Sequence, residues 1–172
     1  MTLNLKKRII KMLIFQHLKG GDILLERFER FSFAISKISR CWNKLATEEM
    51  EKYGLKGPCA LYLLTIYRSN DGITATKLAE ACSKDKADVS RAVTLMEKHG
   101  LVVKESMGQN LYRAKILLTE KGKAAAENIS TSACIAVEAA GNGVSDTNRE
   151  IFYSTLESIA ENLEEICSKG LG

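Results

Sequence analysis

Residues 74–103 read TATKLAEACSKDKADVSRAVTLMEKHGLVV, and this stretch decides the fold. Thr74 is a favourable N-cap for a short helix ending near Ala81, because its hydroxyl can accept a hydrogen bond from a backbone amide of the first turn. Leu78 and Ala81 are expected to face inward in this helix. Residues 82–84 then form a turn.

A longer helix is predicted directly after this turn, over residues 86–98. Asp85 is its expected N-cap, and Gly100 suits the left-handed position that follows a helix. Its apolar residues recur at spacings of three and four, which is typical of one buried face. These residues are Val89, Ala92, Val93 and Met96.

Two short apolar runs follow, at residues 101–103 and 115–118, and both are predicted to be strands. Residues 107–110 supply turn residues between them. Helix, turn, helix and hairpin in this order are typical of a winged helix-turn-helix.

Further helices are predicted on both sides of this unit. Pro58 suits the start of a helix over residues 59–67. Thr119 precedes an alanine-rich helix that Gly141-Asn142-Gly143 ends, and Ser145 or Asp146 caps a last helix.

The first and last helices each carry an apolar seam, in which apolar residues alternate at spacings of four and three. In the first helix they are Leu24, Phe28, Phe31, Ile35, Ile38, Trp42 and Leu45. In the last helix they are Phe152, Leu156, Ile159, Leu163 and Ile166. A homodimer joined through these helices would cover both seams, and C2 is the commonest symmetry. The alternative is that the two helices pack on each other within one subunit.

Composition and length are those of one globular domain. The 172 residues are 45% hydrophobic and 27% charged. No apolar run approaches the ~20 residues of a membrane-spanning helix. The apolar run 12–15, after the basic Lys6-Lys7-Arg8, is too short for a signal peptide. We therefore expect a cytoplasmic protein with no membrane partner.

Charge is distributed unevenly along the chain. The net charge is +6 over residues 1–71, +4 over residues 72–123 and −6 over residues 124–172. A basic front and an acidic tail suit a protein that presents one end to a polyanion. The alternative is ordinary variation of charge between helical surfaces.

The sequence offers no catalytic or metal-binding motif. Its five cysteines (Cys41, Cys59, Cys82, Cys134 and Cys167) are widely spaced, and the only histidines are His17 and His99. That pattern favours neither a zinc site nor a disulfide framework. A phosphate-cradling glycine loop is also absent. We expect no cofactor and no enzymatic activity.

In order and spacing, three motifs resemble the MarR (multiple antibiotic resistance regulator) family. They are Leu78-Ala79-Glu80, Val89-Ser90-Arg91 and the run from Leu95 to Val102, and Leu118-Thr119-Glu120-Lys121-Gly122 matches the family's exit from the wing. The resemblance covers roughly residues 24–168. It implies a transcriptional regulator, most often a repressor, that binds a pseudo-palindromic site on double-stranded DNA as a homodimer.

The implied fold is mainly α with a small β-hairpin wing. Four segments are expected within one structural domain. They are a basic N-terminal extension (1–22), an N-terminal dimerisation helix (23–57), a winged helix-turn-helix DNA-binding unit (58–119) and C-terminal dimerisation helices (120–172).

The resemblance implies that the helix over residues 86–98 enters the major groove with its N-terminal half. Arg91 is the candidate for a bidentate contact with guanine, and a phosphate contact is the alternative. Asp88 stands where the family often has a small hydroxyl residue. An acid there repels phosphates but can accept a hydrogen bond from cytosine. The remaining candidates in and around this helix are Thr74, Thr76, Lys84, Lys86, Ala87, Ser90 and Thr94.

On the wing, the candidates for DNA contact are Lys104, Asn110, Arg113 and Lys115. The family's wing motif is aspartate, any residue, arginine. One alignment places Asn110 and Tyr112 in those two positions, and the other places Arg113 in the arginine position. The aspartate is absent in both alignments.

The family commonly responds to small aromatic molecules or to oxidants. The candidate effector-binding residues are Phe31, Trp42, Tyr62 and Tyr67, with a plain core role as the alternative. The candidate redox-active residues are Cys82, which lies near two lysines, and Cys59, which lies at a helix start. A winged helix used only for protein–protein contact is a further alternative.

Overall fold

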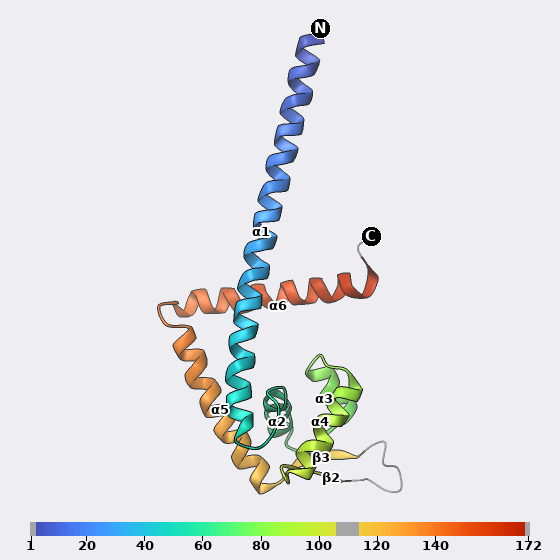
Figure 1. Cartoon of the computed structure of the whole chain (residues 1–172), viewed down its shortest axis with the longest axis vertical. Helices are drawn as coiled ribbons and strands as arrows, with labels where there is room; N and C mark the ends of the chain where they lie inside the picture. The colour runs from blue at the N-terminus through green and yellow to red at the C-terminus, as the bar shows by residue number, and fades with distance from the viewer. Residues whose placement is uncertain (1–2, 106–113, 171–172) are drawn as a thin grey trace.

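The computed structural model of the chain describes residues 3–105 and 114–170, with side-chain detail from residue 23 onwards. The elements in these ranges follow one another as shown in Figure 1. The helices are α1 (Leu3–Glu51), α2 (Cys59–Tyr67), α3 (Ala75–Ala81), α4 (Lys86–Lys98), α5 (Glu120–Ala140) and α6 (Asp146–Lys169). The strands are β1 (Ile73–Thr74), β2 (Val102–Glu105) and β3 (Lys115–Leu118).

The strands form one antiparallel sheet in the order β1-β3-β2. Val102 pairs with Leu118 in the predicted hairpin, and Ile73 pairs with Ile116 on the other edge of β3. The sequence therefore predicted the hairpin correctly but missed β1. A two-residue strand is too short to show the alternation that identifies strands.

The core lies where the end of α1, the helices α2, α3 and α4 and the sheet meet α5. Its largest fully buried side chains are Met50, Leu63, Leu78, Val89, Val93, Met96, Leu101, Val102 and Ile116. The prediction for Ala81 was wrong, because this residue is exposed and Ala79 is buried. Since α3 packs against both α2 and α4, its buried face includes two consecutive residues, Leu78 and Ala79.

Helix α1 is longer than predicted. It begins at Leu3, whereas the sequence suggested an ill-defined basic segment up to residue 22. Gly20 and Gly21 did not end the helix, because a glycine in a helix costs only about 1 kcal/mol relative to alanine. No proline interrupts α1, which projects away from the winged unit with the N-terminus at its far end (Figure 1).

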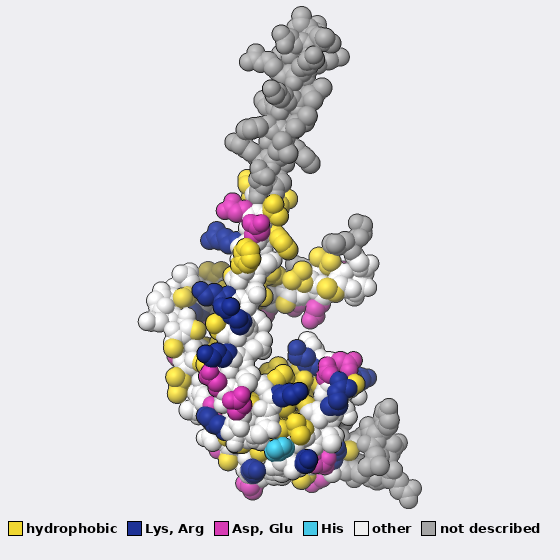
Figure 2. Space-filling model, viewed as in Figure 1, with side chains coloured by type: hydrophobic (Ala, Val, Ile, Leu, Met, Phe, Trp, Pro, Cys, Tyr) yellow, Lys and Arg dark blue, Asp and Glu magenta, His cyan; other side chains and the backbone are white. Residues whose placement is uncertain are grey.

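Both predicted seams are uncovered in the single chain. In α6, Phe152, Leu163 and Ile166 are 49%, 47% and 41% exposed, and the helix has no buried residue. The α1 seam is likewise exposed from Leu24 to Leu45. Figure 2 shows hydrophobic side chains at the surface of both helices. This exposure does not fit the alternative in which α1 and α6 cover each other within one subunit.

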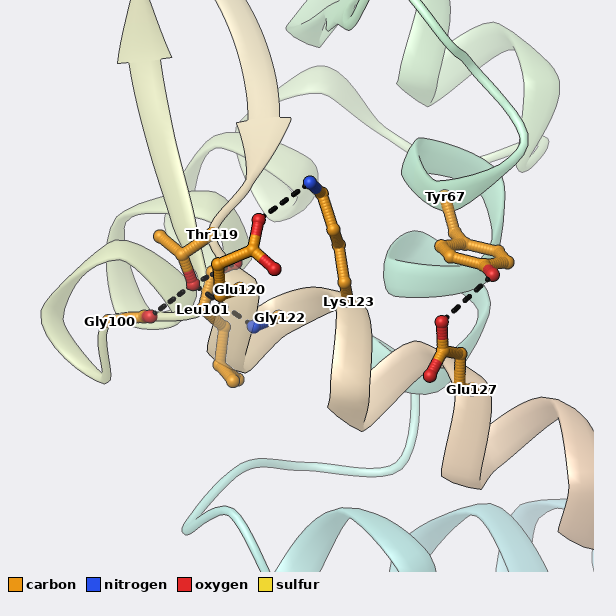
Figure 3. A network of polar contacts seen from close by, with 8 residues as sticks. All are labelled: Tyr67, Gly100, Leu101, Thr119, Glu120, Gly122, Lys123 and Glu127. Atoms are coloured by element: carbon orange, nitrogen blue, oxygen red, sulfur yellow. Dashed lines mark hydrogen bonds and ion pairs between the residues drawn. The ribbon is translucent and has the colours of Figure 1, made fainter.

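The first turn of α5 is tied to the end of α4 (Figure 3). The Thr119 hydroxyl lies 2.7 Å from the carbonyl oxygen of Gly100 and accepts a hydrogen bond from the amide of Gly122 at 3.0 Å. A Cβ atom on Gly122 would lie 1.9 Å from the carbonyl oxygen of Leu101. Only glycine fits at this position without a shift of the backbone.

A second tie fixes the corner between α5 and α6. The guanidinium of Arg149 donates to the carbonyl oxygens of Gly141 (3.0 Å) and Val144 (3.2 Å), and it pairs with Glu138 at 3.3 Å. Ser145 caps α6 by accepting a hydrogen bond from the amide of Asn148. The direction of α6 is therefore set by one side chain of its own first turn.

Replacing Gly122 by alanine is expected to lower the free energy of unfolding by about 3 kcal/mol, because the added methyl group collides with backbone. Gly100→Ala is the matched control. Gly100 has φ +71° and open space around its Cβ position. Gly100→Ala should therefore lower the free energy of unfolding by only about 1 kcal/mol. Urea unfolding measures both values. Equal losses for the two variants would contradict the close approach.

Candidate nucleic-acid interface

The helix-turn-helix is built by two capped helices. The Thr74 hydroxyl accepts a hydrogen bond from the amide of Lys77, and the Asp85 carboxylate accepts one from the amide of Ala87 at 2.7 Å. In the turn between them, Ser83 has φ +49°, in the left-handed region. Both predicted caps are therefore confirmed, and α4 begins at Lys86 as expected.

Helix α4 has two distinct faces. Val89, Val93 and Met96 are at most 1% exposed and anchor the helix in the core. The predicted candidates on this helix are exposed and point away from the core: Lys86, Ala87, Asp88, Ser90, Arg91 and Thr94. The predicted candidates on this helix thus share one surface.

Some of the exposed candidates for DNA contact already form hydrogen bonds or ion pairs within the chain. On α4, an amino group of the Arg91 guanidinium donates to the carboxylate of Asp88. The Thr94 hydroxyl donates to the carbonyl oxygen of Ser90 at 3.0 Å. On β2, the ammonium group of Lys104 pairs with Glu97 at 2.8 Å.

The other candidates differ in position. Thr76 and Lys84 are exposed, whereas Thr74 and Lys115 are half-buried and pair with each other across β1 and β3. Asn110 and Arg113 lie outside the described residues. Figure 2 shows Lys and Arg side chains over the winged unit, interleaved with acidic ones.

A cavity of about 640 Å³ lies beside the winged unit, between α1, α2 and α5. Of the four candidate effector-binding residues, Trp42 and Tyr62 line this cavity, whereas Phe31 and Tyr67 do not. Burial raises the pKa of the Tyr62 phenol above its ordinary value. Tyr67 lies instead in a separate hollow, where its hydroxyl bonds Glu127 at 3.2 Å, and this carboxylate raises its pKa (Figure 3).

Sequence reasoning missed the polar part of the cavity lining. Glu49 accepts hydrogen bonds there from Lys52 at 2.8 Å and from Ser132 at 3.1 Å. Lys84, predicted as a DNA contact, also lines the cavity. Helical spacing from Trp42 could have identified Glu49, but no local pattern links α1 to Ser132.

The two candidate redox cysteines are buried. Cys59 and Cys82 are 3% and 6% exposed, and burial raises the pKa of the Cys59 thiol. The sulfur of Cys82 lies 3.4 Å from the hydroxyl of Thr65. Among the described residues, no group of three or more His, Cys, Asp or Glu side chains is placed to hold a metal ion, and no helix is long and apolar enough to span a membrane.

Comparisons with known proteins agree with this geometry. The model of the MarR family matches residues 53–108. An HTH-type transcriptional regulator of Bacillus subtilis (strain 168), YybA, is 29% identical over 130 residues, which are 76% of this chain and 86% of that protein.

Solved structures show the same fold. A MarR transcriptional regulator from Methanosarcina mazei Go1 is 26% identical, with a TM-score of 0.69 over 80% of this chain and 99% of that one. A putative MarR family regulator from Listeria monocytogenes, complexed with a 26mer DNA, is 24% identical, with a TM-score of 0.72 over 81% and 94%. CouR from Rhodococcus jostii RHA1, bound to p-coumaroyl-CoA, is 21% identical, with a TM-score of 0.64 over 76% and 91%.

The overall fold is thus similar to that of MarR transcriptional regulators over most of this chain. In sequence over residues 53–108 and in fold over most of its length, the chain is similar to the MarR family of winged helix-turn-helix transcriptional regulators.

Proposed function

We propose that this protein is a repressor that binds a pseudo-palindromic operator as a homodimer and leaves it when a small aromatic molecule binds. The observation that carries the proposal is the exposed face of α4, which presents polar side chains on a helix anchored by buried Val89 and Val93. A bound dimer would block access of the polymerase to overlapping promoter DNA.

The first turns of α4 are suited to the major groove, because a recognition helix contacts base edges with its N-terminal residues. Arg91 is the candidate for bidentate contact with guanine. Thr76, Lys84 and Lys86 lie near the starts of α3 and α4, where they can hold phosphates. Lys104 and Lys115 belong to the strands that lead into and out of the wing.

The dimer is supported by the uncovered seams of α1 and α6. Burying an apolar side chain such as Leu163 contributes about 1.5–3 kcal/mol, so the exposed seams are a strong driving force for association. A C2 dimer would present two copies of α4, which suits two half-sites related by a dyad.

The effector site is supported by the cavity between α1, α2 and α5. Its volume of about 640 Å³ is in the usual range for small-molecule sites. Trp42 and Tyr62 offer aromatic surface, and Lys84 offers positive charge. The relative CouR is bound to p-coumaroyl-CoA, a molecule with an aromatic acyl group. A ligand that favours another spacing of the two α4 helices would release DNA.

Binding to a 26-base-pair duplex of random sequence should weaken as salt rises, with a logarithmic slope of about −0.9 per phosphate neutralised. Fluorescence anisotropy at several salt concentrations measures this slope. Absence of binding even at low salt would exclude DNA recognition and favour the protein–protein alternative.

Arg91→Ala should remove the preference for a duplex selected from a random pool, because the bidentate contact is worth about 1–3 kcal/mol of discrimination. Its oligomeric state should not change, since Arg91 lies on α4, away from the exposed seams of α1 and α6. Competition binding and sedimentation measure the two properties. Dissociation of this variant into monomers would contradict the division between recognition and dimerisation.

Leu163→Glu should convert the dimer to monomers, because it places a charge in the α6 seam. Glu161→Gln, on an exposed position of the same helix, is the control and should remain dimeric. Sedimentation equilibrium distinguishes the two. If Leu163→Glu stayed dimeric, another surface would have to form the interface.

Alkylation of Cys59 should be slow at pH 7, because its raised pKa keeps the thiol protonated. The alkylation rate should increase only at a higher pH than the rate for a free cysteine does. Peptide mass spectrometry after timed exposure to iodoacetamide measures the rate. Rapid reaction at neutral pH would revive the thiol-based redox alternative.

A further inference from the structure

We propose that Asp88 is a positioning residue that holds the guanidinium of Arg91 for the edge of a guanine, so that the pair recognises the operator as one unit. This inference rests on the proposed function, in which α4 enters the major groove. It assigns a specificity role to an acidic residue that would otherwise only repel DNA.

The two side chains meet on the exposed face of α4, one turn apart. An amino group of Arg91 donates to a carboxylate oxygen of Asp88. Asp85, not Asp88, receives the free amides at the start of the helix, from Ala87 at 2.7 Å and from Asp88 itself at 3.4 Å. The Asp88 carboxylate is therefore available for Arg91.

This pair has little to contribute to folding. The side chains of Arg91 and Asp88 are 71% and 59% exposed, and exposed ion pairs of this kind add little to the free energy of unfolding. In a DNA groove the same pair would lose water, and its electrostatic interaction would strengthen.

Pairing with Asp88 leaves Arg91 suited to bases. A guanidinium has five N–H donors, and a contact with one carboxylate oxygen leaves enough of them for the O6 and N7 atoms of guanine. Holding the long side chain in one orientation before binding reduces the entropy lost on binding. A bidentate base contact depends on that orientation.

The same pairing disfavours phosphates. Contacts to phosphates are driven by net positive charge, and the Arg91–Asp88 pair carries none. The second Asp88 oxygen can accept a hydrogen bond from the amino group of a cytosine. Asp88 thus lowers affinity for random DNA while supporting affinity for a site with guanine at the right position. Both effects increase the specificity ratio, which is the affinity for the selected site divided by the affinity for random DNA.

Asp88→Ala should weaken binding to a duplex selected by the wild-type protein by about 10-fold, within the range expected for loss of one oriented base contact. Binding to a random duplex should be unchanged or tighter. Selection with the variant should show a relaxed preference for guanine at one position of each half-site. In an Arg91→Ala background, Asp88→Ala should cause no further loss of preference.

Glu120→Ala is the matched control. Glu120 is also an acid in the first turn of a helix, and it pairs with Lys123 three residues later at 2.7 Å, but it lies on α5. It should leave the specificity ratio unchanged. Urea unfolding checks that each variant is folded, and the isosteric Asp88→Asn replaces Asp88→Ala if the latter is not.

Each remaining outcome is decisive. Equal tightening on both duplexes would mean that Asp88 only repels DNA, and additive effects of the two substitutions would mean that they act independently. Either result overturns the inference but leaves the proposed function intact. Lack of any sequence preference in the wild-type protein would instead overturn the proposed function itself.

Discussion

Helix α4, the proposed recognition helix, is held in place by contacts between its end and the first turn of α5. The Thr119 hydroxyl binds the carbonyl of Gly100, and the ammonium group of Lys121 binds the carbonyl of His99 at 2.9 Å. Gly122 allows the two backbones to approach more closely than any other residue would. Because these hydrogen bonds involve the last turn of α4 and the residues that follow it directly, α4 and the start of α5 form one connected unit.

This unit connects the candidate DNA surface to the rest of the chain. Helix α5 also packs on α2, and the cavity lies where α1, α2 and α5 meet. A molecule bound beside Trp42 and Tyr62 would therefore contact the helices that determine the position of α4. In the proposed mechanism, effector binding and DNA binding are coupled through packed helices rather than through a flexible segment.

Local signals made much of this fold predictable. The bounds of α2, α4 and β3 agree with those expected from sequence, because a proline, an aspartate cap and a short apolar run mark them unambiguously. Thr119 and Gly100 were likewise identifiable by their residue types. The start of α1 was wrong because two glycines only weaken a helix, and β1 was missed because pairing with β3 determines it.

The candidate site was predictable only in part. Helical spacing placed the α4 residues on one face, and the Asp88–Arg91 pair follows from their separation of three residues. The cavity lining could not be predicted, because Glu49 and Ser132 are brought together by tertiary packing. The positions of Asn110 and Arg113 in the wing remain predictions.

Because Arg149 holds the corner between α5 and α6, a small rotation at this corner would move the far end of α6 by a large distance. Its 24 residues span about 36 Å at 1.5 Å per residue. A rotation of about 10° at the corner would move the far end by about 6 Å, slightly more than one helical turn. In the proposed dimer, a displacement of this size would change which residues of the two subunits meet, and the three contacts of the Arg149 guanidinium oppose it.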